Sequence, residues 1–345
     1  MAAAAVEKLG GGHPSYEEEQ AISAAFTDDQ KLWIAKLTGV NQDKYSYYHR
    51  TLLTGGSILC FDLAAKQWLS ATKFEAIDKD ENREEILFGW KSHLMLLIYQ
   101  RYEGVKYRQL MEFTVADGWK TVADFQVDPS AGFSSGYRGE VVYSVEDYGL
   151  TLAATNEGDG SVTLSKLTLK ESNGVLSGKV ELVMDLPLGA APFFGGSGWV
   201  VGVADCGEMI LTLGGSQGCG FHWEPLTLSV ASVADKNAGL LKKEHDHRRP
   251  PWGFSGPRHM FRLPSVNKWL MLGGSTPRGM EQTDFNYEVW SLDVSKANLD
   301  GLLWKKEGVE IPKEILKYDF SVAADTSAKT VYLVDLKNGV WKMTV

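Results

Sequence analysis

The sequence predicts an all-β fold assembled from repeated units, and three observations lead to this prediction. The chain of 345 residues contains 36 Gly, 11 Trp, 13 Tyr and 14 Phe, which supplies many turns and many large side chains suited to strands. Similar stretches recur about sixty residues apart, at LTLAAT (150–155), LTLGGS (211–216) and LMLGGS (270–275). The chain also ends on TVYLVDLKNGVWKMTV, which is similar to SILCFDLAAKQWLSAT near its start. We therefore expect one large repeat domain.

Each unit reads as four short strands separated by turn residues. Ahead of the recurring stretches stand VVYSVEDYG, VVGVADCGE and FRLPSVNKW, which are apolar runs closed by a polar turn. Two of the units later contain GLLKKE (239–244) and GLLWKKE (301–307). Four short strands repeated in this way are typical of the blades of a β-propeller. The sequence thus predicts an all-β propeller.

One unit carries the pattern most clearly, within residues 259–307. Its second strand ends in a glycine pair, its third strand has a Trp ahead of an Asp, and a Trp opens its fourth strand. These positions are Gly273, Gly274, Trp290, Asp293 and Trp304. The unit resembles a kelch repeat, and the resemblance extends in degenerate form over residues 31–345. It implies a kelch-like propeller, in which glycines permit positive φ and each Trp fills the gap between neighbouring sheets.

The glycine pair varies between units. It recurs at Gly55-Gly56 and Gly214-Gly215, and it is replaced at Ala153-Ala154 and Ile98-Tyr99. Segments that run from an Asp or its equivalent to a Trp predict six units, with five or seven blades left open. The predicted blades span residues 40–75, 84–127, 137–187, 197–244, 255–309 and 316–345.

The last unit has room for three strands only. We expect the strand LWIAKLTG, within residues 31–39, to complete it, because a closed ring leaves no long unpaired sheet edge. Residues 1–30 would then be an N-terminal extension with a short helix. Ser15 and Glu18 have the spacing of a capping box, and Ile22 and Phe26 would share one face of that helix.

Charge and cysteine content narrow the class of protein. The net charge is −9, from 35 basic and 44 acidic residues, so a nucleic-acid partner is not expected. Cys60, Cys206 and Cys219 form an odd, small set, which suits a reducing compartment and packing rather than nucleophilic roles. The sequence has no apolar run long enough for a membrane span and no basic leader typical of a signal peptide. We expect a cytoplasmic protein, with the nucleus left open, and a protein partner rather than a membrane.

The candidate binding residues lie in loops that a propeller would gather on one face. Those loops are 101–108, 218–224, 244–258 and 275–288, and they are rich in Arg, His and Trp. Arg and Trp are enriched at interface hot spots, and Arg suits carboxylate recognition. We expect an interaction scaffold that binds an acidic segment; the alternative is that long loops simply hold polar residues. The candidate residues are Arg101, Arg108, His222, Trp223, His245, His247, Arg248, Arg249, Trp252, Arg258 and Arg278.

Metal binding and catalysis have weaker support in the sequence. His245 and His247 form a His-x-His pair, but spacing places no further ligand beside them, so we expect no metal and no cofactor. The sequence contains no catalytic triad order and no readable pair of carboxylates. The alternative function is an enzyme of the sugar-isomerising or alcohol-oxidising kind, with its site at the propeller axis. An enzyme would require an axial pocket with convergent polar groups and perturbed titrating residues, whereas a scaffold would require a broad Arg- and aromatic-rich rim.

Overall fold

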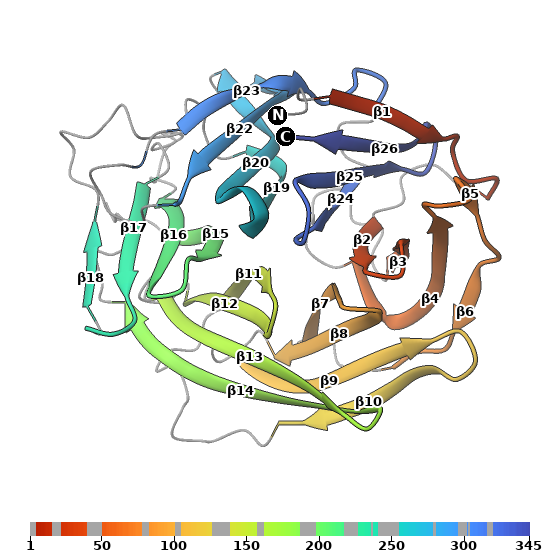
Figure 1. The fold of residues 1–345 in the computed structure, drawn as a ribbon, viewed down its shortest axis with the longest axis horizontal. Helices are drawn as coiled ribbons and strands as arrows, with labels where there is room; N and C mark the ends of the chain where they lie inside the picture. The colour runs from red at the N-terminus through yellow and green to blue at the C-terminus, as the bar shows by residue number, and fades with distance from the viewer. Residues whose placement is uncertain are drawn as a thin grey trace.

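The structure is a computed structural model. It describes residues 5–15, 22–39, 50–77, 83–100, 105–125, 139–156, 162–186, 198–216, 227–235, 237–240, 255–278, 281–295, 302, 304–315 and 320–345. These residues form six antiparallel sheets arranged in a ring, each running from an inner strand near the axis to an outer strand at the rim (Figure 1). The chain is an all-β, six-bladed β-propeller. The described part includes one short 3₁₀ helix, η3 (Pro264–Val266).

The first three sheets along the chain have their inner strand first in sequence. The first holds β2 (Ile22–Thr27), β3 (Lys31–Gly39), β4 (Arg50–Asp62) and β5 (Gln67–Trp68), with β6 (Thr72–Phe74) also on β4. The second holds β7 (Arg83–Trp90), β8 (His93–Gln100), β9 (Lys106–Thr114) and β10 (Gly118–Asp124). The third holds β11 (Gly139–Glu146), β12 (Gly149–Asn156), β13 (Val162–Ser172) and β14 (Val175–Leu186).

The remaining sheets follow the same order. The fourth holds β15 (Gly198–Asp205), β16 (Met209–Ser216), β17 (Thr227–Ser232) and β18 (Asn237–Leu240). The fifth holds β19 (Ser255–Leu263), β20 (Lys268–Arg278), β22 (Glu288–Asp293) and β23 (Trp304–Glu310), with β21 (Glu281–Phe285) also on β20. The sixth holds β24 (Phe320–Asp325), β25 (Thr330–Asp335), β26 (Gly339–Thr344) and β1 (Ala5–Gly10).

The N-terminal region differs from the sequence-based expectation in two ways. Residues 31–39 form β3, the second strand of the first sheet, and β1 stands on β26 instead (Figure 1). The expected helix is also wrong, because Ile22–Thr27 is the inner strand β2 of the first sheet. Tertiary packing decided both outcomes: Ala24, Ala25 and Phe26 are all buried, which suits an inner strand between two neighbouring sheets better than one face of an isolated short helix.

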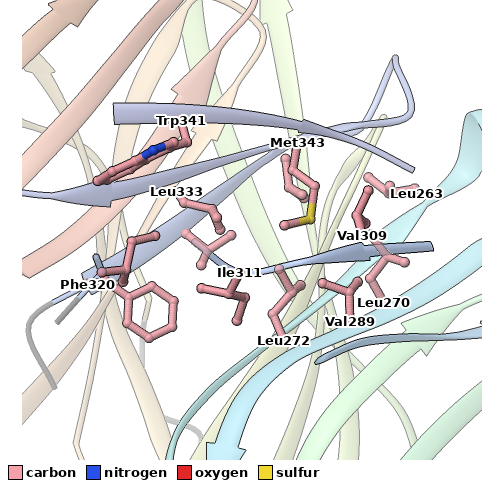
Figure 2. Close-up of a cluster of buried hydrophobic side chains, with 13 residues drawn as sticks. Leu263, Leu270, Leu272, Val289, Val309, Ile311, Phe320, Leu333, Trp341 and Met343 are labelled. Atoms are coloured by element: carbon pink, nitrogen blue, oxygen red, sulfur yellow. The ribbon is translucent and has the colours of Figure 1, made fainter. Parts of the chain in front are cut away.

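Neighbouring sheets pack through apolar clusters that fill the space between them. Figure 2 shows the cluster between the fifth and sixth sheets, where Leu270 and Leu272 of β20 approach Leu333 of β25. Trp341 on β26 belongs to the same cluster and is 2% exposed. Trp304, the residue expected to act as a wedge, packs in the cluster between the fourth and fifth sheets. Large side chains therefore hold the sheets in a rigid ring.

Two glycine pairs lie inside strands rather than at the ends of second strands. Gly55 and Gly56 fall within β4 with φ values of 97° and 158°, and Gly273 falls within β20 with φ of 75°. The β3–β4 register shifts beside Gly56, and the β19–β20 register shifts between Ser255 and Arg258. Positive φ at these glycines thus bends continuous strands where pairing is irregular, as in a bulge.

The antiparallel order gives the ring two distinct faces. Turns between the first and second strands lie together: the Asp28 N–H donates to the Lys91 carbonyl at 2.7 Å, and the Trp90 Nε1–H donates to the Asp147 carbonyl at 3.0 Å. We call this side the turn face; it comprises residues 28–30, 91–92, 147–148, 206–208, 264–267 and 326–329. The second strands end, and the third strands begin, on the opposite side of the ring, which we call the connection face.

Candidate functional site

Most of the predicted binding residues lie outside the described residues. These are Arg101, His222, Trp223, His245, His247, Arg248, Arg249 and Trp252. The backbone of Arg258 is in β19, paired with Gly273, and that of Arg278 is in β20, paired with Glu281. Arg108 is in β9 and is half-buried; its Nη2 donates to Gln100 Oε1, and its Nε is buried without a hydrogen-bond partner. The described members therefore occupy strand ends near the connection face, but their side chains are not shown to converge.

A cavity lies at the axis, near the turn face. It has a volume of about 320 Å³ and is lined by the last residues of β2, β7, β11, β19 and β24 together with the turns that follow four of them. These five inner strands belong to five different sheets, so it is closure of the ring that brings the lining segments together (Figure 1). A concave site of this size, at the centre of a rigid scaffold, suits a small ligand.

Two charged side chains stand in the cavity wall. Glu146 ends β11, and Arg262 is the penultimate residue of β19. The pKa of Glu146 is raised to about 7, mainly by burial and also by the negative charge of the neighbouring Asp205. Two groups oppose this rise of the pKa: the Ser144 hydroxyl, which donates to Glu146 Oε1 at 2.8 Å, and the positive charge of Arg262. Glu146 can therefore accept or donate a proton near neutral pH.

The Arg262 side chain is buried beside these groups. It is 7% exposed, and its Nη2 donates to Asn267 Oδ1 at 3.2 Å. Its Nε and Nη1 are buried and have no hydrogen-bond partner among the described residues. Burial raises the pKa of the nearby Cys206 thiol to about 11, although the positive charge of Arg262 and a hydrogen bond between the two side chains act in the opposite direction. Arg262 thus places a positive charge in the wall of the axial cavity, with its Nε and Nη1 available for a further partner.

Asp205 joins the third and fourth sheets just behind the cavity. Its Oδ2 accepts hydrogen bonds from Lys166 Nζ at 2.7 Å, from Thr151 Oγ1 at 2.7 Å and from the Tyr148 hydroxyl. Its Oδ1 accepts the Gly207 N–H at 2.8 Å. Burial opposes the ionised form, but these donors outweigh it and lower the pKa of Asp205. Through these hydrogen bonds Asp205 links the third and fourth sheets.

The mouth of the cavity is acidic. Burial raises the pKa of Asp28, and the negative charges of Asp325 and Asp147 raise it further, while Lys91 lowers it. Lys91 Nζ also lies 4.5 Å from the centre of the Trp90 ring. The mouth thus disfavours a ligand with several negative charges.

Sequence reasoning missed both charged residues of the cavity. Glu146 lies in the stretch VVYSVEDYG and Arg262 lies in FRLPSVNKW, and each stretch by itself indicates only an apolar strand before a turn. The available signal was an ionisable residue at the end of a strand expected to lie at the axis. Their convergence could not be recognised, because the two residues are far apart in the sequence and meet only in the closed ring.

The described residues give no support for a metal site. They contain no group of three or more His, Cys, Asp or Glu side chains arranged to hold an ion, and His245 and His247 are outside them. Within the same part of the chain, Cys60 and Cys206 are free thiols, and burial raises the pKa of Cys60 to about 12. No helix in the described ranges is long and apolar enough to cross a membrane.

Comparison with known proteins shows the fold and nothing finer. No family model matches the sequence, and no curated protein matches it. A complex of the GH93 α-L-arabinofuranosidase of Fusarium graminearum with arabinobiose is similar with a TM-score of 0.52 and 10% identity, over 99% of this chain and 98% of that chain. The Nup133 β-propeller domain of Vanderwaltozyma polyspora is similar with a TM-score of 0.50 and 11% identity, over 100% of this chain and 97% of that chain. One neighbour is a glycosidase and the other is a β-propeller domain, and at this level of identity the similarity shows only that this chain is a β-propeller.

Proposed function

We propose that this protein is an interaction scaffold that binds a partner protein through its connection face. The observation that supports this most directly is the strand order, in which β8, β16, β18 and β20 end on the same side of a closed ring on which β9, β17, β19 and β22 begin. The sequence concentrates Arg, His and Trp in the four segments that connect these strands. Loops on a rigid scaffold commonly carry binding residues, and Arg and Trp are favoured at interface hot spots.

The chemistry of these loops suggests the partner. Their guanidinium groups suit carboxylates, in a protein whose net charge is −9 overall. A partner with an acidic segment would be attracted to this face and repelled elsewhere. The backbone positions of Arg258 and Arg278, close to where β19 begins and β20 ends, agree with this placement.

The test compares two triple variants with matched charge changes. The connection-face variant carries Arg248→Glu, Arg249→Glu and Trp252→Ala. The control carries Lys120→Glu, Lys170→Glu and Val115→Ala, three positions that are exposed on β10, β13 and the β9–β10 turn.

We expect affinity capture from cells to recover acidic partners with the wild type and the control variant but not with the connection-face variant. An excess of a Glu-rich peptide should release those partners, and salt should weaken the interaction. Recovery of the same partners with both variants, or partners unaffected by the acidic peptide, would contradict the proposal.

A second candidate function is an enzyme with its site at the axis. The cavity lined by five inner strands favours it, because Glu146 is placed there with a pKa of about 7. Such a carboxyl group could move a proton to or from a sugar or an alcohol. A panel of aldoses, ketoses and sugar alcohols, followed by NMR, would test this. Turnover by the wild type that is lost in Glu146→Gln but kept in the exposed control Glu208→Gln would support an axial enzyme; no turnover of any panel member would argue against it.

A further inference from the structure

The axial cavity contains a buried cation that forms no direct ion pair with a carboxylate in the described part of the chain. Arg262 is only 7% exposed, yet no described carboxylate forms an ion pair with its guanidinium group. Its side-chain partners, the amide of Asn267 and the thiol of Cys206, are both neutral groups. Leaving two buried N–H groups of a cation without partners is unfavourable. In the wall of a cavity, such groups are available to a ligand that supplies the missing partner.

The carboxylates near Arg262 do not neutralise it directly. Asp205 is already held by Lys166, Tyr148 and Thr151. Glu146 lies near enough for the two charges to interact, but its Oε1 accepts from Ser144. The cavity thus has room, a buried positive charge that no carboxylate pairs with directly, and a carboxyl group that is partly protonated at neutral pH.

We propose that the axial cavity binds a small monocarboxylate, with the carboxylate of the ligand on the Arg262 guanidinium and beside the Glu146 carboxyl group. A guanidinium matches the geometry of a carboxylate and forms strong charge-assisted hydrogen bonds with it. The neutral form of Glu146 can donate a hydrogen bond to a carboxylate oxygen, as a protonated buried carboxylic acid does. This binding does not depend on the scaffold function, which uses the opposite face.

Size and charge define the ligand class more closely. A volume of about 320 Å³ corresponds to roughly ten water molecules at about 30 Å³ each, so a ligand of roughly ten non-hydrogen atoms is expected. Phe26, Phe88 and Tyr143 are among the lining residues, which suits an aromatic or aliphatic body. Asp28 and Asp147 at the mouth repel multiply charged anions, so a monoanion is favoured over a phosphate.

Binding should weaken as the pH rises through about 7. The groups that face Glu146 are Ser144 and Asp147 from its own segment, Asp205 and Cys206 from the β15 end, and Arg262 from β19. Asp28, Lys91 and Asp325 belong to the mouth. Of these, Glu146 is the group whose charge changes near pH 7, and its ionised form would repel a bound carboxylate. The affinity should therefore fall about tenfold per pH unit above 7.

The experiment uses three probes of one shape: benzoate, neutral benzamide and phenyl phosphate. Binding to the full chain is measured by calorimetry and ligand-observed NMR at pH 6 and pH 8. We expect benzoate to bind at pH 6 at least tenfold more tightly than either other probe. Arg262→Gln should weaken benzoate binding roughly ten- to hundredfold, Arg262→Lys should weaken it less, and Glu146→Gln should remove the loss of affinity between pH 6 and pH 8.

A third variant keeps the test informative if Arg262→Gln does not fold. Asp147→Asn removes an exposed negative charge at the mouth and should tighten benzoate binding about two- to threefold without a change in fold. Absence of benzoate binding, equal binding of benzamide, or benzoate binding unchanged in a folded Arg262→Gln protein would each overturn the proposal. Tighter binding of phenyl phosphate would overturn the choice of a monocarboxylate. None of these outcomes bears on capture of a partner by the connection face.

Discussion

Glu146→Gln should make stability less dependent on pH. In the folded protein burial raises the pKa of Glu146 from 4.5 to about 7. Between those values the folded state keeps a proton that the unfolded state has lost, so ionisation of this group destabilises the fold as pH rises from about 4.5 to 7. Above pH 7 both states are ionised, and the full penalty is present. The rise of the Glu146 pKa corresponds to a loss of about 3 kcal/mol in the free energy of unfolding, as an upper limit for a partly exposed group.

Glutamine preserves the size of the side chain and the acceptor for the Ser144 hydroxyl, but it does not titrate. The free energy of unfolding of Glu146→Gln minus that of the wild type should therefore rise by up to about 3 kcal/mol between pH 4.5 and pH 8. Urea denaturation at several pH values, followed by Trp fluorescence, measures the free energy of unfolding of both proteins and hence their difference. Glu208→Gln removes an exposed carboxylate in the β15–β16 turn and reports what loss of such a charge does by itself. If the two variants show the same pH dependence, or if the Glu146→Gln difference falls with pH, the reasoning about the buried carboxyl group is wrong.

Three further predictions concern the ring itself. Trp341→Ala removes a side chain that is 2% exposed between the fifth and sixth sheets, and it should lower the free energy of unfolding by about 3–5 kcal/mol in a urea titration. The control Val115→Ala, at a site that is 64% exposed, should change the free energy of unfolding by less than about 0.5 kcal/mol. Gly89→Ala should lower the melting temperature and loosen the cavity wall, because a Cβ at this position would overlap the backbone oxygen of Phe26 on the neighbouring inner strand; an unchanged melting temperature would show that β7 and β2 can separate freely. Deletion of residues 1–12 removes β1 and uncovers the edge of β26. The shortened protein should associate more strongly as its concentration rises, which size-exclusion chromatography with light scattering measures. A monomeric product as stable as the wild type would refute a closing role for β1.

The architecture was largely predictable from the sequence, because it is encoded locally and then repeated. Alternation of apolar residues with turn residues recurs in every unit, and each unit buries its apolar faces only against its neighbours. Six sheets and an all-β class follow from that pattern. The position of β3 was predicted wrongly because LWIAKLTG has the character of any buried strand. Its place in the first sheet depends on pairing with β4, which is a choice among several equivalent partners.

The N-terminal strands were missed because their local signals favour other structures. SYEEEQAISAAF has the capping-box spacing and the helix-forming residues of a short helix, yet Ile22–Thr27 is a strand at the axis. Burial of Phe26 against the sixth sheet, where its ring stacks on Tyr332 at 5.4 Å, outweighs that propensity. The weak strand AVEKLG pairs with β26 because the outer edge of the last sheet is otherwise open.

By itself the sequence determined the all-β class, the repeated units, the acidic balance and the basic, aromatic loops, since each is a property of nearby residues, and it favoured six units with five or seven left open. Tertiary structure alone decided which N-terminal strand stands on β26 and that Glu146 and Arg262 meet at the axis. Those two residues are separated by more than a hundred positions, and only closure of the ring brings the ends of β11 and β19 to one cavity. Long-range proximity of this kind arises from the packing of whole sheets against one another, and no local pattern of residues records it.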